Sequence, residues 1–386
     1  MSVATKALLV CSLAVFVDSV LYYMLVPLIP ELAVRASLTQ LQIGSLFGSY
    51  AFCLIVSTVL AGRLQFSSGQ RRPMLLAIAG LGIATILFAL SSDFAVLLLA
   101  RCVQGVAAGF TWVLGLALVI AYFPGDKRGA ALGVTFSVAN AGYLLGPPIG
   151  GFLLSWFGYL APFIFGIIVV VIDGAARYFL LPEVHAHPEP NDISWRDLLR
   201  ERSAPLLVCS MGLGAAAFAM LDVVLPLYLH DAFAATPDVI GALFVALGST
   251  FVFTSPMIGR LADRFGYAKA LCMGHVLTAL LIMGPLLASS LWQMAFVLVF
   301  LGLFSNLVFA PCQPGMASVV DAKQSTHYAV GVSLLSTSYS VGMMAGAYLG
   351  SFVAEYFGLQ AVMVGASILF LGSAVWSCVI VRGGSR

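Results

Sequence analysis

The sequence predicts an all-α membrane protein with twelve transmembrane helices in two pseudo-symmetric bundles of six. Of the 386 residues, 61% are hydrophobic and 9% are charged, whereas roughly 25% of the residues of a soluble domain are charged. Uninterrupted apolar runs long enough to cross a bilayer recur along the chain, and their continuity favours helices over the alternating strands of a membrane barrel. Short stretches also recur after about 200 residues, which indicates two similar halves.

The predicted spans form two sets of six, each long enough for about 30 Å of hydrocarbon. In chain order they cover residues 5–30, 41–63, 74–92, 95–122, 130–156, 160–182, 205–229, 238–261, 270–289, 292–319, 328–354 and 360–381. The first six form an N-terminal bundle over 1–182, and the last six form a C-terminal bundle over 205–386. The longest polar stretch, the linker 183–204, joins them. Within it, Ser194 and Asp197 have the spacing of a capping box for a short helix.

The basic residues predict the orientation in the membrane. Nearly all of the 18 Lys and Arg fall in loops on one side of the predicted spans. Arg35 falls on the other side and Arg101 lies inside a span. By the positive-inside rule, both termini and the linker are expected in the cytoplasm.

Segments of the two halves align at a steady spacing. The stretch "LLVCS" occurs at residues 8–12 and again at 206–210, and "GGFLLSWFG" at 150–158 is echoed by "GSFVAEYFG" at 350–358. Because six spans return the chain to the same side, the duplication is parallel. Two such halves, with a site between them near the bilayer midplane, are the arrangement of alternating-access transporters.

Other classes of function find little support in the residues. There is no convincing nucleophile–base pair, metal cluster or phosphate-binding loop, so we expect neither an enzyme nor a cofactor. The net charge of +2 gives no reason to expect a nucleic-acid partner. The seven cysteines lie in apolar segments and are interpreted as packed thiols, without a disulfide framework or metal spacing.

Two acids within the spans are the first candidates for function, because an ionisable group in the bilayer is costly. Asp18 lies about 18 Å along its helix from Lys6, near the midplane. Asp222 lies in the equivalent span of the second half, about 7 Å nearer the outside. The alternative for either acid is a carboxyl group bonded to neighbouring hydroxyls that serves packing alone.

Two arginines also lie in spans. Arg101 has two compatible interpretations: it tunes the proton affinity of an acid in a cavity, or it ties helices of the first half together. Asp173 and Arg177 are one turn apart with the acid first, which is the favourable order, so this pair is expected to be structural.

Four motifs carry a family resemblance. The stretch "GRLADRFG" at 259–266 resembles motif A of the major facilitator superfamily, and "ARCVQGVAAG" at 100–109 resembles its motif B. The stretch "GYLLGPPIGG" at 142–151 resembles motif C, and "FVDSVLYYMLVPLIP" at 16–30 resembles motif D of the twelve-span drug–proton antiporters. The whole chain looks most similar to the vesicular amine transporters and their bacterial relatives, which implies the major facilitator fold.

The resemblance implies conformational roles for motifs A and C. In motif A, Gly259 and Gly266 permit tight turns, while Asp263 and Arg264 make contacts that latch the two halves in one state.

In motif C, Gly142, Gly146 and Gly150 line one helix face and allow a neighbouring helix to approach closely. Pro147 is expected to bend the span. The family implication is a seal against proton leak.

The resemblance also assigns coupling residues. Asp18, Arg101 and Asp222 match the acid of the first span, the arginine of the fourth and the glutamate of the seventh, which makes them the expected proton-coupling residues. Three further charged positions of the family are occupied here by Tyr50, Phe309 and Ser336. With these charges missing, Asp18 and Asp222 are expected to carry most of the coupling.

The function predicted from these residues is a proton-coupled antiporter that exports lipophilic organic cations, such as amines and drugs. Aromatic faces suit an organic cation. The expected substrate-binding residues are Asp18, Asp222, Tyr22, Tyr23, Tyr50, Trp112, Asn140, Asn306, Phe309, Ser336 and Tyr339. The alternative is an exporter of a non-cationic metabolite such as a siderophore or sugar. A non-transporting sensor or scaffold is a weaker alternative.

The expected partners are a small organic cation, protons and the lipid bilayer. The chain is expected to work as a monomer, as related transporters do. The long glycosylated outer loop of the amine transporters is missing here, and the sequence has no Asn-x-Ser/Thr site. A prokaryotic plasma (inner) membrane is therefore the expected location.

Overall fold

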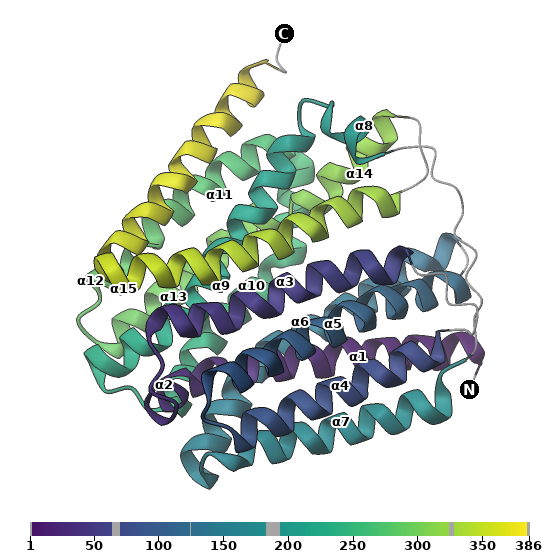
Figure 1. Cartoon of the computed structure of the whole chain (residues 1–386). Helices are drawn as coiled ribbons and strands as arrows, with labels where there is room; N and C mark the ends of the chain where they lie inside the picture. Colours follow the sequence, from purple (N-terminus) through teal and green to yellow (C-terminus); the bar gives the residue numbers. More distant parts are fainter. Residues whose placement is uncertain (1, 64–69, 124, 183–193, 324–327, 384–386) are drawn as a thin grey trace. The chain divides into compact units, whose positions relative to one another are not determined.

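The computed structural model describes residues 2–63, 70–123, 125–182, 194–323 and 328–383. Over these residues the secondary structure is helical, with no strand (Figure 1). The helices are α1 (Val3–Met24), the 3₁₀ turn η1 (Val26–Leu28), α2 (Ile29–Arg35), α3 (Gln40–Arg63), α4 (Arg71–Leu90), α5 (Phe94–Tyr122), α6 (Gly125–Phe157), α7 (Leu160–Leu180), α8 (Trp195–Leu199), α9 (Ala204–Phe233), α10 (Pro237–Phe265), α11 (Tyr267–Leu281), α12 (Gly284–Leu287), α13 (Leu291–Phe309), α14 (Cys312–Ala322) and α15 (Tyr328–Gly383).

Eleven helical segments of the described ranges are long and apolar enough to cross a membrane. The last of them, Val330–Ile380, is 51 residues long and contains a break. At this break Gly358 has φ 80° and ψ 168°, a conformation open to glycine because it has no Cβ. The two parts of α15 therefore correspond to the last two predicted spans, and the predicted all-α membrane fold is confirmed.

The contacts divide the chain into two compact units. The first comprises Met1–Pro188 and Leu229–Val245, and the second comprises Glu189–Tyr228 and Ala246–Arg386. The end of α9 and the start of α10 thus group with the first unit. Of the predicted linker 183–204, residues 183–193 lie outside the described ranges.

In the first unit, α1 is the central helix. It packs against α5, α6 and α7, while α3 lies along α5 and α4 lies along α7 (Figure 1). In the segment Val3–Arg35, which contains α1, 78% of an apolar stretch of 18 residues is buried inside the protein. In α7 the corresponding share is 28%. Val17 and Leu21 of α1 join Ile78 and Leu81 of α4 in one apolar cluster. Asp18 therefore sits on the most enclosed helix of its unit.

Three glycines of α6 let its backbone lie directly on α1. A Cβ on Gly142 would lie 2.7 Å from the Cβ of Ser19, and one on Gly150 would lie 2.1 Å from the carbonyl oxygen of Met24. A Cβ on Gly146 would lie 3.0 Å from the backbone N of Met24. This close approach is the one expected from the spacing of the glycines.

The end of α6 also contacts the start of α10. The Ser155 hydroxyl donates to Oδ1 of Asp238 at 2.9 Å, and the Asp238 amide donates back to the Ser155 oxygen at 3.1 Å. A Cβ on Gly151 would lie 2.2 Å from the carbonyl oxygen of Pro237. The helix α6 continues through Pro147 up to this contact. Motif C thus holds both α1 and α10 by backbone proximity.

The second unit repeats this packing with other residues. A Cβ on Gly342 of α15 would lie 2.0 Å from the carbonyl oxygen of Gly212 in α9, and one on Gly346 would lie 2.0 Å from that of Ala216. The first part of α15 therefore lies on α9 as α6 lies on α1. The helix pairs α6–α1 and α15–α9, which correspond in the sequence repeat, thus also pack in the same way.

The short helix α8 is attached to the second unit. Ser194 and Asp197 form the predicted capping box, and the hydrogen bonds from Ser194 hold the pKa of the Asp197 carboxyl below its usual range. Leu198 is fully buried in an apolar cluster of this unit. Trp195 Nε1 donates to the Ser333 hydroxyl at 3.0 Å. The second unit thus buries Leu198, while Trp195 and Leu199 of α8 stay exposed.

The close contact between α6 and α1 predicts a sharp difference between two glycines of one helix. Gly150→Val should lower the free energy of unfolding by about 2 kcal/mol or more, because the new side chain meets backbone that cannot rotate away. Gly133→Val is the matched control, since a Cβ there has no neighbour within 4 Å. Melting temperature and monodispersity in detergent measure both. Equal stability of the two variants would contradict the assigned contact.

Candidate functional site

The carboxylate of Asp18 is enclosed by groups from two other helices. Its side chain is 3% exposed. Oδ2 accepts a hydrogen bond from Nε1 of Trp112 at 3.0 Å and one from the Tyr50 hydroxyl at 3.3 Å. Oδ1 is buried and has no hydrogen-bond partner among the residues that the structure describes. One oxygen is thus held by α3 and α5, and the other keeps its acceptor capacity for a ligand or a proton.

Aromatic rings surround this carboxylate. The ring of Tyr22, one turn from Asp18, lies 4.7 Å from that of Tyr50 and 4.8 Å from that of Tyr23. The ring of Trp112 lies 6.2 Å from that of Phe136. The first unit therefore brings four of the predicted substrate residues, all aromatic, to the surroundings of the predicted acid.

Arg101 is buried in a box of aromatic rings. Its side chain is 1% exposed, and its Cζ lies 4.0 Å from the ring centre of Phe47, 5.3 Å from that of Tyr22 and 5.9 Å from that of Tyr50. Nη1 donates to Oε1 of Gln104 at 3.0 Å. No carboxylate of the described residues lies within ion-pair distance, so ring faces and one amide stabilise this cation.

Tyr50 links the two charged groups. Its hydroxyl binds Asp18, while the face of its ring lies toward Arg101. The sequence interpretation of Arg101 as a tuner of a cavity acid has this contact as a physical route. The structure also agrees with the interpretation of Arg101 as a tie between helices, because Arg101 of α5 contacts rings from α1, from α3 and, through Phe88, from α4.

Asp173 and Arg177 form a fully buried ion pair at 2.7 Å within α7. Nη1 of Arg177 also donates to the carbonyl oxygen of Met74 at 3.0 Å and to the Thr111 hydroxyl at 3.1 Å. The pair therefore joins α7 to α4 and α5, as expected of a structural pair. Thr111 precedes Trp112, so the same turn of α5 serves the ion pair and the carboxylate of Asp18.

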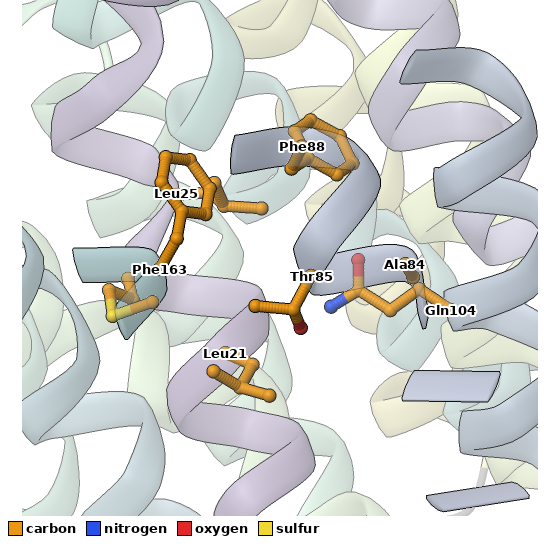
Figure 2. A pocket seen from close by; sticks show the side chains of 8 residues that line it. Leu21, Leu25, Ala84, Thr85, Phe88, Gln104 and Phe163 are labelled. Carbon is orange, nitrogen blue, oxygen red and sulfur yellow. The ribbon is translucent and has the colours of Figure 1, made fainter. Parts of the chain in front are cut away.

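A small pocket lies in the first unit beside the aromatic box (Figure 2). Its lining is apolar except for Thr85 and Gln104. Phe88 lines it as well, and the ring of Phe88 lies 5.5 Å from Cζ of Arg101. Since no acid lines this pocket, we do not assign the organic cation to it.

Asp222 has a different environment from Asp18. Its side chain is 3% exposed, and its Oδ1 is buried without a hydrogen-bond partner within the described ranges. No described N–H or O–H group is recorded as a donor to this carboxyl, in contrast to the two that hold Asp18. An ionised carboxylate without donors is strongly disfavoured in an apolar interior. Asp222 is therefore suited to hold a proton.

The other candidates in the second unit divide into packed and exposed residues. Asn306 is fully buried, and its Nδ2 donates to the carbonyl oxygen of Phe251 at 2.7 Å and to the Thr254 hydroxyl at 3.1 Å. Phe309 lies in a cluster of rings, 5.4 Å from Phe251 and 6.4 Å from Tyr339.

Ser336 is exposed, and so is Asn140 of the first unit. Within its unit, each of these two side chains is open to a ligand or to lipid. Their predicted roles as substrate residues stay predictions.

The motif A residues lie where α10 ends and α11 begins. Gly266 has φ 88° and precedes α11, which is a conformation that favours glycine. Gly259 has open space around a Cβ position, and Arg264 is exposed. Asp263 belongs to α10, but its side chain lies outside what the structure describes. The latch predicted for these residues stays a prediction.

Sequence reasoning missed the residues that surround Arg101. Gln104 carries a local signal, because a residue three positions along a helix lies on the same face. Phe47 and Phe88 come from other helices, and their distance in sequence gives no sign of the contact. The sequence predicts that a buried Arg101 needs partners, but it does not predict which residues these partners are.

Comparison with known proteins places the chain among transporters. A sequence model of the Major Facilitator Superfamily matches residues 11–229 and 207–384. The synaptic vesicular amine transporter of Bos taurus is 25% identical over 326 residues, which are 84% of this chain and 63% of that protein. The MFS-type transporter SLC18B1 of Mus musculus is 26% identical over 358 residues, 88% of this chain and 78% of that protein. The chain thus spans less than two thirds of the amine transporter's length.

Solved structures show the same fold. A bacterial homologue of the human lysosomal transporter Spinster superimposes with a TM-score of 0.76 at 16% identity, covering 99% of this chain and 98% of that one. The human organic anion transporter MFSD10 superimposes with a TM-score of 0.65 at 20% identity, covering 98% and 100%. The predicted resemblance and fold are confirmed.

The buried ion pair predicts a pattern across single and double variants. Arg177→Met should lower the free energy of unfolding by about 3–5 kcal/mol, because it leaves the Asp173 carboxylate buried without its partner. The double variant Asp173→Leu/Arg177→Met should recover much of this loss, since no uncompensated charge remains. Denaturant or thermal unfolding in detergent measures both. A single variant as stable as the wild type would refute the structural role.

Proposed function

Because the chain belongs to the Major Facilitator Superfamily, whose related members here are transporters and not enzymes, we propose that it is a proton-coupled antiporter that exports lipophilic organic cations by alternating access. One observation carries the proposal. Asp18 is a buried carboxylate with one oxygen held by two donors and the other without a partner, in a setting of aromatic rings. A protonated amine needs both features, a carboxylate and ring faces.

Asp18 is suited to the cation. Hydrogen bonds from Trp112 and Tyr50 stabilise its ionised form, so the carboxylate persists at a depth where a bare charge is costly. Its unpaired Oδ1 can accept an ammonium N–H. Since a carboxyl that holds a proton has no negative charge for an ammonium group, proton and cation compete at this residue.

Asp222 is the second acid of the cycle. Without recorded donors in its surroundings, it keeps its proton until a cation or a change of conformation favours ionisation. If both loaded forms of the protein can switch sides, protons that enter drive the cation out. Coupling then needs only that each acid binds one or the other species in each state.

The proposal includes a location and a direction. The loops rich in Lys and Arg support a cytoplasmic location for both termini. A prokaryotic plasma membrane and a monomeric working form are part of the same proposal. The similarity to synaptic vesicular amine transporters supports an amine as substrate. The match covers part of their length at about a quarter identity, so substrate class and coupling are proposals for this chain.

An exporter of a non-cationic metabolite is the competing proposal, and one observation favours it. Arg101 lacks a carboxylate partner in the described ranges, so an anionic group of a substrate could pair with it. Growth of a drug-sensitive host on a panel of cationic dyes, neutral sugars and siderophores separates the two. Resistance to cations supports the antiporter, and a response confined to the other compounds supports the competitor.

Replacement of the Asp18 carboxylate should abolish coupled transport. Asp18→Asn keeps the shape and the hydrogen-bond acceptor but removes the charge that binds the cation. Uptake of an organic cation into inside-out vesicles, driven by an imposed pH gradient, should fall to the level of empty vesicles. The control is Asp93→Asn, because Asp93 caps α5 through its side chain and Asn caps equally well. Full pH-driven uptake by the Asp18 variant would sink the mechanism.

Binding of a cation should displace protons from the purified protein. When a lipophilic amine is added in weak buffer at a pH low enough for Asp18 to be partly protonated, the wild type should release protons, because a carboxyl that binds the ammonium group must ionise. Asp18→Asn should release none, and Asp222→Asn should bind the amine with reduced release. A pH electrode or indicator dye measures this. Equal release by the wild type and the Asp18 variant would contradict competition at Asp18.

A further inference from the structure

Two helices of the second unit, α11 and the last part of α15, meet through polar contacts that the proposed transport cycle does not use. Nε2 of His275 lies 3.2 Å from the Ser373 hydroxyl, and Nδ1 lies 3.3 Å from the Ser377 hydroxyl. His275 and Ser377 are fully buried. One turn further along α11, the carbonyl oxygen of Ala279 accepts a hydrogen bond from Ser367 at 2.8 Å. These contacts fix the register of the two helices.

Two cysteines face each other next to this histidine. Cys272 lies one turn before His275 on the same face of α11, and Cys378 follows Ser377 in α15. Their Sγ atoms are 2.7 Å apart, so the two thiols already share the contact that a disulfide requires. Sγ of Cys272 also lies 3.6 Å from the carbonyl oxygen of Ala374, which keeps it on the side of α15.

The pair is open to lipid. Cys378 is exposed, and its neighbours Val375 and Val379 are 66% and 56% exposed. All three lie within the apolar segment Val330–Ile380. A molecule that dissolves in the bilayer therefore has direct access to Cys378.

Cys53 of α3 and Cys102 of α5 are a second pair of interacting thiols, but both are only partly exposed, whereas Cys378 is exposed. The remaining thiols have different surroundings. Cys312 is fully buried, and its Sγ lies 3.0 Å from the carbonyl oxygen of Val308. Cys11 is fully buried as well. Cys209 is exposed but has no recorded cysteine contact. Burial makes a thiol inert, whereas access and a second thiol in contact make it reactive.

We propose that Cys272 and Cys378 form a redox-active dithiol that a lipid-soluble quinone oxidises to a disulfide. In this step two S–H bonds break and one S–S bond forms. The two electrons and two protons pass to the quinone, which becomes a quinol. The product ties α11 covalently to the last part of α15. A cross-link over so long a stretch of chain restricts the unfolded state and stabilises the second unit.

The chemistry is independent of the proposed transport function. It uses none of the residues assigned to the cation or to proton coupling, and oxidation of the pair alters no charge in the membrane. A failure of either proposal therefore leaves the other one intact, and the two are tested by separate measurements.

The test counts thiols in the full-length protein. Purified wild type in liposomes is treated with a short-chain quinone, quenched, unfolded and labelled with a maleimide. We expect the number of labelled thiols to fall from seven to five, and proteolysis without reductant to yield a peptide pair linked through Cys272 and Cys378. The single variants Cys272→Ser and Cys378→Ser should each keep six labelled thiols through the same treatment. Cys209→Ser is the matched control and should fall from six to four.

Three results would overturn the proposal. One is seven labelled thiols in the treated wild type. Another is a quinone adduct on Cys378 in place of the linked peptides. The third is a linkage between other cysteines while Cys272 and Cys378 stay reduced. The linked peptides are sought in the wild type itself, so the test does not depend on the folding of a variant. A water-soluble oxidant of low lipid solubility should react more slowly than the quinone, because the pair faces the bilayer.

Discussion

A charge inside the bilayer can be stabilised only by groups of the protein itself, and the first unit is built around that constraint. Three buried charged groups of this unit are stabilised in three different ways. Asp18 is held by two donors, Arg101 by aromatic faces and Arg177 by an ion pair. All three depend on α5, which supplies Arg101 itself, Thr111 for Arg177 and Trp112 for Asp18. A small rotation of this helix disturbs every buried charge of the unit together, so α5 cannot be optimised for one charge alone.

The glycines of motif C also help to position a buried charged group, in addition to packing two helices together. Because α6 lies on α1 at backbone distance, no layer of flexible side chains separates the two helices. The height and rotation of α1 are then fixed by rigid groups, and Asp18 is presented to Trp112 and Tyr50 without adjustment. The same helix meets the start of α10 through Gly151 and Ser155. Motif C is thus a positioning element for the candidate carboxylate as well as a packing surface.

The sequence predicts those features well that depend on one residue or on the hydrophobicity of one segment. It predicts poorly which residues of different helices contact each other. Composition and run length are properties of each segment, so the spans follow from them. The cost of burying a charge likewise draws attention to Asp18 and Asp222, as it does to the arginines within spans. Contacts between helices depend on the rotation of each one, which no single span encodes. For that reason the aromatic box around Arg101 was not predicted, and Asn306, predicted as a substrate residue, donates to Phe251 and Thr254 within the packing of its unit.

The two acids occupy pseudo-equivalent helices, yet their surroundings have diverged, and this difference bears on coupling. Donors favour the ionised form of Asp18, while the apolar setting of Asp222 favours its protonated form. At the position of the missing acid of the tenth span, Phe309 packs among rings, so no buried charge there needs a partner. In the proposed exchange of a proton for a cation, one site that tolerates negative charge and one that resists it can divide the two roles. Two acids in unequal environments allow this division without the other charged residues that the resemblance to the amine transporters would supply.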